Sequence, residues 1–118
     1  MSQVKIKRQF RVVTANIGTG TAASTTLRMD DMAGAIIHLP VVTASGTLQV
    51  WGNTTDTGTF TQLFGSDGTA STITVPAGAT AVGTSYSFPD AAYGLAYVKL
   101  VASSANLTAT AASVTLKS

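Results

Sequence analysis

Residues 59–75 read Thr-Phe-Thr-Gln-Leu-Phe-Gly-Ser-Asp-Gly-Thr-Ala-Ser-Thr-Ile-Thr-Val. Asp67 and Gly68 stand between two β-prone segments, and an Asp-Gly pair tolerates the positive φ angles that a tight hairpin requires. The stretch therefore predicts a strand over 59–64, a sharp turn, and a second strand over 71–75.

Similar short apolar runs, bounded by Gly, Asp, Asn and Ser, recur about every 8 to 12 residues along the chain, as in all-β sandwiches and barrels. We predict about eight strands, and the runs that are candidates for them number nine: residues 5–17, 25–29, 35–42, 46–53, 59–64, 71–75, 84–88, 96–102 and 112–117. Longer connections at 18–24 and 77–83 favour two packed sheets. We therefore expect one domain over residues 1–118, an all-β, jelly-roll-like sandwich of two antiparallel sheets. No Cys-Trp-Cys spacing supports an immunoglobulin-like alternative.

The period-two alternation within these runs predicts which side chains face the core. In the first strand, Ile6, Phe10 and Val12 share one face and Arg11 lies on the other. In the third run, Ile37 and Leu39 point inward and His38 outward, and Pro40 places the run at a sheet edge or ends it early. The expected core of the last two strands is Val98, Leu100, Val114 and Leu116.

The composition argues against most catalytic chemistry. The 118 residues contain no Cys, no Glu and a single His, which removes disulfides, thiolate metal sites and cysteine nucleophiles. His38 has no Gly-x-Ser-x-Gly partner, and Asp30 and Asp31 are read as a solvated loop or, alternatively, as ligands that help to bind Ca²⁺. We therefore expect a non-enzymatic protein without a cofactor.

Charge and hydropathy exclude two kinds of partner. A net charge of +2 is too small for a nucleic-acid reader, which normally carries a basic stripe. No run approaches the ~20 apolar residues of a membrane span, and no signal peptide opens the chain. The cytoplasm of the producing cell is the expected compartment at synthesis.

Basic residues gather at the start of the chain. Lys5, Lys7, Arg8 and Arg11 all lie within a basic N-terminal segment over residues 1–12. This segment is read either as an arm that docks on an acidic partner or as the solvent face of the first strand, because apolar residues alternate with the charges.

Trp51 is the second candidate for a contact residue. It is out of phase with Leu48 and Val50, which predicts an exposed or interfacial position. Together with the three tyrosines it is read either as packing or as a platform on which a sugar stacks.

The order of strands and turns from Gly46 to Lys117 resembles small β-sandwich proteins that decorate or cement the capsids of tailed bacteriophages. The resemblance lies in Gly-Thr-Leu-Gln-Val-Trp-Gly-Asn from residue 46, Ser-Tyr-Ser-Phe-Pro-Asp from residue 85, and Tyr-Val-Lys-Leu-Val-Ala-Ser from residue 97. A looser similarity extends to discoidin-like, galactose-binding jelly rolls, although this chain is poorer in charged and aromatic residues than they are.

The resemblance implies a virion protein on the capsid surface, made in the host cytoplasm, which binds the major capsid protein and resists the pressure of packaged DNA. It also implies self-association, most commonly as a trimer. Lys5, Lys7, Arg8, Arg11 and Trp51 are then the expected partner-binding residues. The alternative is a glycan- or receptor-binding module of a phage tail or fibre that uses Trp51.

Overall fold

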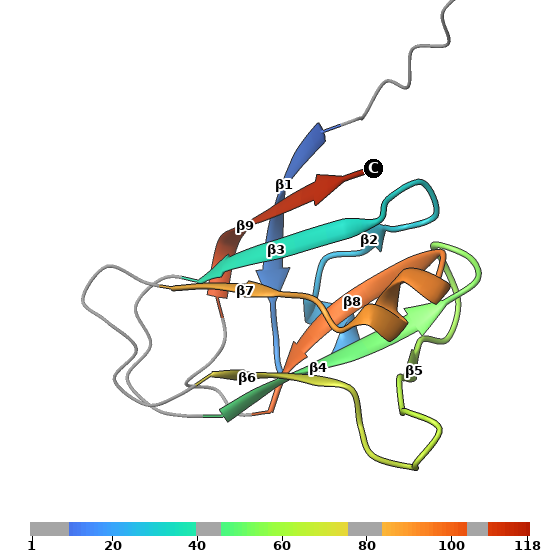
Figure 1. Ribbon diagram of the computed structural model, residues 1–118. Coiled ribbons are helices and arrows are strands. Elements are labelled where there is room, and N and C mark those ends of the chain that lie inside the picture. The colour runs from blue at the N-terminus through green and yellow to red at the C-terminus, as the bar shows by residue number, and fades with distance from the viewer. Residues whose placement is uncertain (1–9, 40–45, 76–83, 104–108) are drawn as a thin grey trace, which may run out of the picture.

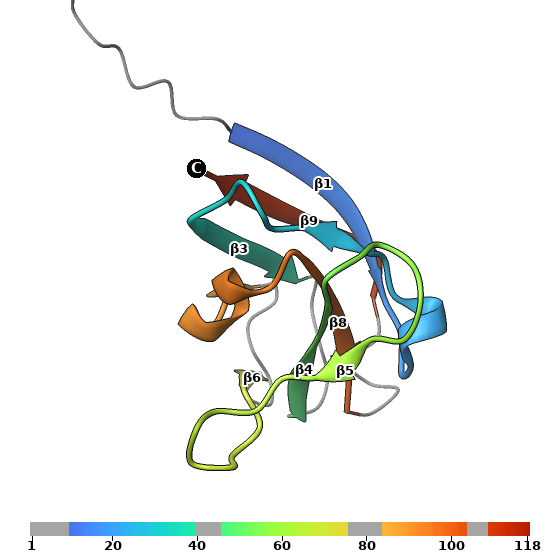
Figure 2. The same ribbon diagram turned by 90° about the vertical axis from the view of Figure 1, so that its right-hand side faces the viewer.

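Two antiparallel sheets pack face to face and enclose the core (Figures 1 and 2). The computed structural model describes residues 10–39, 46–75, 84–103 and 109–118. Sheet A consists, in order, of β1 (Phe10–Ile17), β9 (Ala109–Lys117), β3 (Gly34–Leu39) and β7 (Thr84–Ser87). Sheet B consists of β2 (Leu27–Arg28), β8 (Tyr97–Ala102), β4 (Gly46–Asn53) and β5 (Thr61–Gln62), and β6 (Thr72–Val75) also pairs with β4.

The chain passes repeatedly between the two sheets. From β1 to β4, and again from β6 to β9, each strand lies in the sheet opposite to its predecessor. This order is that of a jelly roll and confirms the predicted fold class. The described strands number nine, one in each of the nine runs identified from the sequence, so the expected total of about eight was one too low.

The Asp-Gly turn has the predicted geometry. Gly68 has φ of +80°, and the backbone N–H of Gly65 donates to the carbonyl of Thr69 at 2.8 Å. The carboxylate of Asp67 accepts a hydrogen bond from the N–H of Thr69 at 3.0 Å. The turn therefore depends on the left-handed conformation that glycine adopts freely and on a side chain that closes the loop locally.

The core lies between the sheets, where every second side chain of the long strands is buried. Ile37, Leu39, Val98, Leu100, Val114 and Leu116 are all buried, as predicted. Gly52 of β4 faces inward without a side chain, and a Cβ atom there would overlap the Leu95 side chain. The Leu95 side chain therefore packs directly against the backbone of β4 because position 52 is a glycine.

Two further segments correct or refine the expectations from sequence. β3 is a central strand between β9 and β7, so it is no edge strand, and its bounds end at Leu39. Pro40 lies outside the described residues. Asp90–Gly94 forms the short 3₁₀ helix η2, between β7 and β8.

The predicted facing of the first strand is wrong. Phe10 and Val12 are 65% and 56% exposed, whereas Ala15 and Ile17 are buried. Arg11, expected on the solvent side, shares the inward face with them. The reason is a change of phase: apolar residues occupy even positions up to Val12 and odd positions after it, so only one of the two sets faces the core.

Candidate interaction surface

The start of β1 carries the most exposed apolar side chains of the described residues. Phe10, Val12 and Thr14 project from the outer face of sheet A, and we call these three residues the β1 stripe. Because β1 is the outermost strand of its sheet, the stripe lies along a sheet edge. An edge strand with apolar side chains is a typical site for pairing with another chain.

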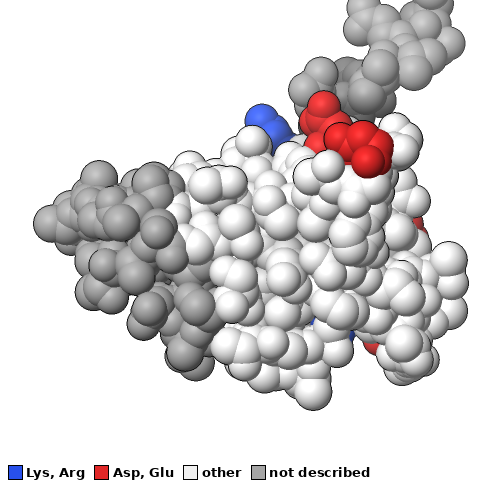
Figure 3. Space-filling model, turned by 90° about the horizontal axis from the view of Figure 1, so that it is seen from below, with Lys and Arg blue, Asp and Glu red and all other residues white. Residues whose placement is uncertain are grey.

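The stripe continues across sheet A as a nearly uncharged surface. Val12 lies opposite Thr115, which lies opposite Ile36, which lies opposite Ser87. A shallow pocket of about 300 Å³ opens over this row, and Asp90, Tyr93 and Lys117 also line it. Burial raises the pKa of the Tyr93 hydroxyl, so the phenol remains neutral at physiological pH. Figure 3 views the other side of the molecule, from below Figure 1, and the described residues place few charged side chains there as well.

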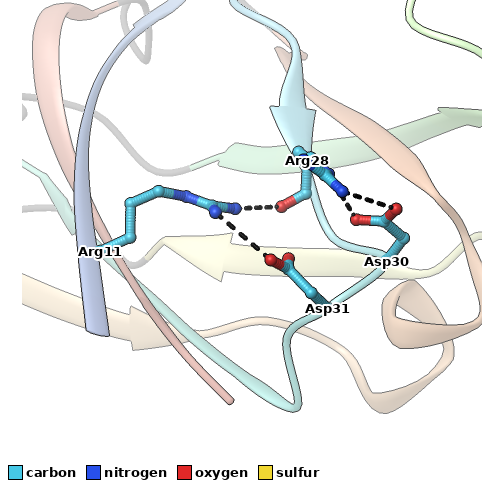
Figure 4. Close-up of polar contacts among 4 residues, drawn as sticks. All are labelled: Arg11, Arg28, Asp30 and Asp31. Atoms are coloured by element: carbon cyan, nitrogen blue, oxygen red, sulfur yellow. Dashed lines mark hydrogen bonds and ion pairs between the residues drawn. The ribbon is translucent and has the colours of Figure 1, made fainter. Parts of the chain in front are cut away.

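Arg11 does not extend into solvent as part of a free basic arm. Its guanidinium donates to the backbone carbonyl of Arg28 at 2.8 Å and lies 3.6 Å from the carboxylate of Asp31 (Figure 4). Arg11 thereby ties β1 of sheet A to β2 of sheet B and to the turn before β3. Of the four predicted basic contact residues, Arg11 is the one that the structure places within the body of the domain.

The neighbouring pair, Arg28 and Asp30, completes this cluster of charges. Two guanidinium nitrogens of Arg28 contact the two carboxylate oxygens of Asp30, at 2.7 and 3.3 Å (Figure 4). This hydrogen bond lowers the pKa of Asp30 below its usual 3.8 and raises that of Arg28. Each carboxylate of the acidic loop therefore already lies against a cation of the chain.

Lys5, Lys7 and Arg8 lie outside the described residues, and the structure does not place them. In the sequence they come immediately before Phe10, the first residue of β1. The basic segment over residues 1–12 carries four positive charges and no acid, whereas residues 13–118 carry three basic and five acidic side chains. The positive charge of the chain is thus concentrated next to the β1 stripe.

Trp51 lies on the outer face of sheet B, as its phase relative to Leu48 and Val50 predicts. Its side chain is half-buried there. Its indole N–H donates to the side-chain oxygen of Gln49 at 3.0 Å. Tyr97 of β8 shares this face, but Tyr86 belongs to β7 of sheet A and Tyr93 packs beside that sheet. The four aromatic residues are therefore divided between the two sheets and do not form one stacking platform.

The outer face of sheet B also holds a covered aromatic that the sequence did not reveal. Phe60 is only 6% exposed, and the ammonium of Lys99 lies 4.7 Å from its ring centroid. The same ammonium donates to the backbone carbonyl of Thr21 at 2.8 Å, in the short 3₁₀ helix η1 (Thr21–Ala23). Finding this cluster requires contacts between residues 39 and 78 positions apart in the chain, which no local pattern encodes.

His38 lies on the outer face of sheet A with a hydroxyl at each ring nitrogen. Nδ1 is 2.6 Å from Ser85 Oγ, and Nε2 is 3.3 Å from Thr115 Oγ1. A serine–histidine pair supports nucleophilic catalysis when a carboxylate orients the imidazole from its other nitrogen. Here a hydroxyl, that of Thr115, lies at the other nitrogen in place of a carboxylate. The contacts of His38 with Ser85 and Thr115 link β3 to β7 and β9 on the outer face of the sheet.

The described residues form neither a metal-binding cluster nor a membrane-spanning helix. Among the residues that the structure describes, no group of three or more His, Cys, Asp or Glu side chains is placed to hold a metal ion. No helix within the described ranges has the length and apolar character needed to cross a bilayer. No family model, curated protein or solved structure matches this chain.

Proposed function

We propose that this chain is a non-enzymatic virion structural protein that binds the outer surface of a phage capsid and stabilises it. The observation that carries the proposal is the β1 stripe, an exposed apolar edge that directly follows the basic segment. In this proposal the major capsid protein is the partner, and the sandwich acts as a rigid block on the shell. The chain reaches the capsid surface after synthesis in the host cytoplasm.

The surface chemistry supports permanent assembly with a neighbour. Thr, Ser, Ala and Gly have short side chains, which lose little conformational entropy when they become ordered at an interface. Only 10% of the residues are charged, so few ions must lose their hydration on docking. Lys5, Lys7 and Arg8 then supply an electrostatic contact to an acidic region of the shell. Arg11 contributes to it through the position of β1, because its own charge is engaged with Asp31.

The number of copies in purified virions of the phage that encodes this chain tests the proposal. We expect quantitative mass spectrometry to find the chain in a fixed ratio to the major capsid protein, near one copy per capsid subunit or per capsomer site. A handful of copies per particle would instead indicate a tail or fibre role. Complete absence from the particle would overturn the proposal.

A set of charge variants tests the role of the basic segment. We expect Lys5→Gln, Lys7→Gln and Arg8→Gln together to reduce shell occupancy at low salt, because attraction between exposed charges is strongest there. The matched control changes the net charge equally at exposed loop positions, as Thr59→Glu, Ser66→Glu and Thr69→Glu. Equal occupancy of the two variants would contradict a specific role for the segment.

A further inference from the structure

The start of β1 has a hydrogen-bonding edge, beside its exposed side chains, to which no residue of the described ranges bonds. In an antiparallel sheet, alternate residues direct their N–H and C=O groups to opposite neighbours. Phe88 N–H donates to the Ala35 carbonyl at 3.1 Å, so Ala35 is bonded toward β7 and the next residue, Ile36, toward β9. Thr115, opposite Ile36, is therefore bonded toward β3. Val12, opposite Thr115, consequently directs its backbone groups away from β9.

The same parity holds along the strand. Phe10 and Thr14 also direct their N–H and C=O groups outward, and no described residue bonds to them there. Asn16, the next residue of this parity, confirms the direction because both its backbone groups bond to Thr25. Asn16 N–H donates to the Thr25 hydroxyl at 2.8 Å, and the Asn16 carbonyl accepts from Thr25 N–H at 3.0 Å. The free edge thus ends at Thr14.

We propose that this edge pairs with the β1 edge of a second copy of the chain, antiparallel and about a two-fold axis at Val12. In this register Val12 lies opposite Val12 of the second copy, and Phe10 lies opposite Thr14. Three such pairs form about six backbone hydrogen bonds. They also place an aromatic beside a β-branched side chain and two valines side by side, which are favourable cross-strand pairs. The two four-stranded sheets then become one continuous sheet.

The distribution of charge and of existing bonds argues against two alternative registers. A two-fold axis at Arg8 would place Arg8 opposite its own copy, and like charges directly opposite are destabilising. An axis at Thr14 would need the backbone groups of Asn16, which Thr25 already occupies. With the axis at Val12, the strands run in opposite directions, so the two copies of Phe10 lie at opposite ends of the interface.

β1 is also the edge best suited to such pairing. At the outer edges of the two sheets, β2 and β5 have two residues each and β6 and β7 have four, whereas β1 has eight. Short edge strands resist pairing with other chains, and a long apolar one invites it. A second copy is the self-complementary occupant, since each chain supplies the same three residues to the other.

Sedimentation of the purified full chain over a range of concentrations tests the proposal without any capsid. We expect the mass to rise from that of one chain to that of two. Val12→Lys places two ammonium groups opposite one another, so we expect it to raise the dimer dissociation constant about tenfold or more. Thr74→Lys, on the exposed face of β6, is the matched control and should leave dimerisation unchanged. Circular dichroism and thermal melting check that both variants remain folded.

Each other outcome contradicts the pairing. A single-chain mass at every concentration, a three-chain mass, or a dimer that Val12→Lys leaves intact would each overturn it. The inference does not rest on the proposed function, because shell occupancy is measured on virions and the mass on the isolated chain.

Discussion

Phe60 and Phe10 both lie on the outer side of a sheet, yet their surroundings are opposite. On sheet B, Phe60 is 6% exposed, and the ammonium of Lys99 lies over its ring and donates to the carbonyl of Thr21. On sheet A, Phe10 is 65% exposed, and no described segment covers it. The chain's own described residues therefore cover the outward aromatic on sheet B but not the one at the start of β1, and we propose that the uncovered region of β1 serves pairing with a second copy.

The largest expected effect separates these two aromatics by their contribution to folding. We predict that Phe60→Ala lowers the free energy of unfolding by about 3 kcal/mol, the usual cost of removing a buried phenylalanine side chain. Phe10→Ala should change it by less than about 0.5 kcal/mol in the monomer, as is usual for surface positions. Urea denaturation at low protein concentration measures both. Similar losses for the two variants would remove the distinction between the two faces.

A smaller effect is expected from the cation that covers Phe60. Lys99→Met keeps the length of the side chain but removes its charge, so the contact with the ring and the hydrogen bond to Thr21 are both lost. We predict a loss of about 1 kcal/mol in unfolding free energy, in line with a cation–π contact and one charged hydrogen bond partly offset by apolar burial. No loss relative to wild type would show that Lys99 lies over Phe60 without stabilising it.

The smallest effect concerns the ion pair between Arg28 and Asp30. The hydrogen bond from Arg28 lowers the pKa of Asp30 in the folded state, so the unfolded chain binds a proton there more readily. Its stabilising contribution is therefore present above pH 3.8 and is lost as the pH falls through the folded-state value. We predict that Asp30→Asn weakens the acid dependence of stability, measured by urea denaturation between about pH 6 and about pH 2.

The exposed loop residue Asp56 provides the control for this measurement. Asp56→Asn should leave the acid dependence closer to that of wild type. An identical pH profile for Asp30→Asn and wild type would show that the contact with Arg28 has no thermodynamic weight. Added salt should reduce the effect in wild type, since both partners are solvent-exposed.

Much of the fold follows from local sequence, whereas the candidate site follows only in part. Alternation identifies the buried side chains of β4, and the Asp67-Gly68 pair identifies the turn between β5 and β6. Both signals depend on residues that are close together in the chain. The facing of β1 does not follow in this way. Phe10 and Val12 form as good an apolar stripe as Ala15 and Ile17, and period two alone does not tell which of two stripes faces the core.

The contacts that define the surface also depend on distant pairs. The sequence places Arg11 either in an arm or on the solvent face of the first strand, but its contact with Asp31 exists only because β1 and the turn before β3 meet in space. The phase change at Val12 is the local signal in the sequence. A strand whose apolar positions change parity midway has two apolar faces, and only one of them faces the core.

Amide hydrogen exchange along β1, followed by NMR at low and high protein concentration, tests directly whether the β1 edge pairs with a second copy. We predict that the amides of Phe10, Val12 and Thr14 exchange rapidly in dilute solution and become protected as the protein concentration rises. Asn16, whose amide already donates to Thr25, should be protected at both concentrations. Protection of the three β1 amides that does not change with concentration would contradict the claim that this edge is a contact surface for a second copy.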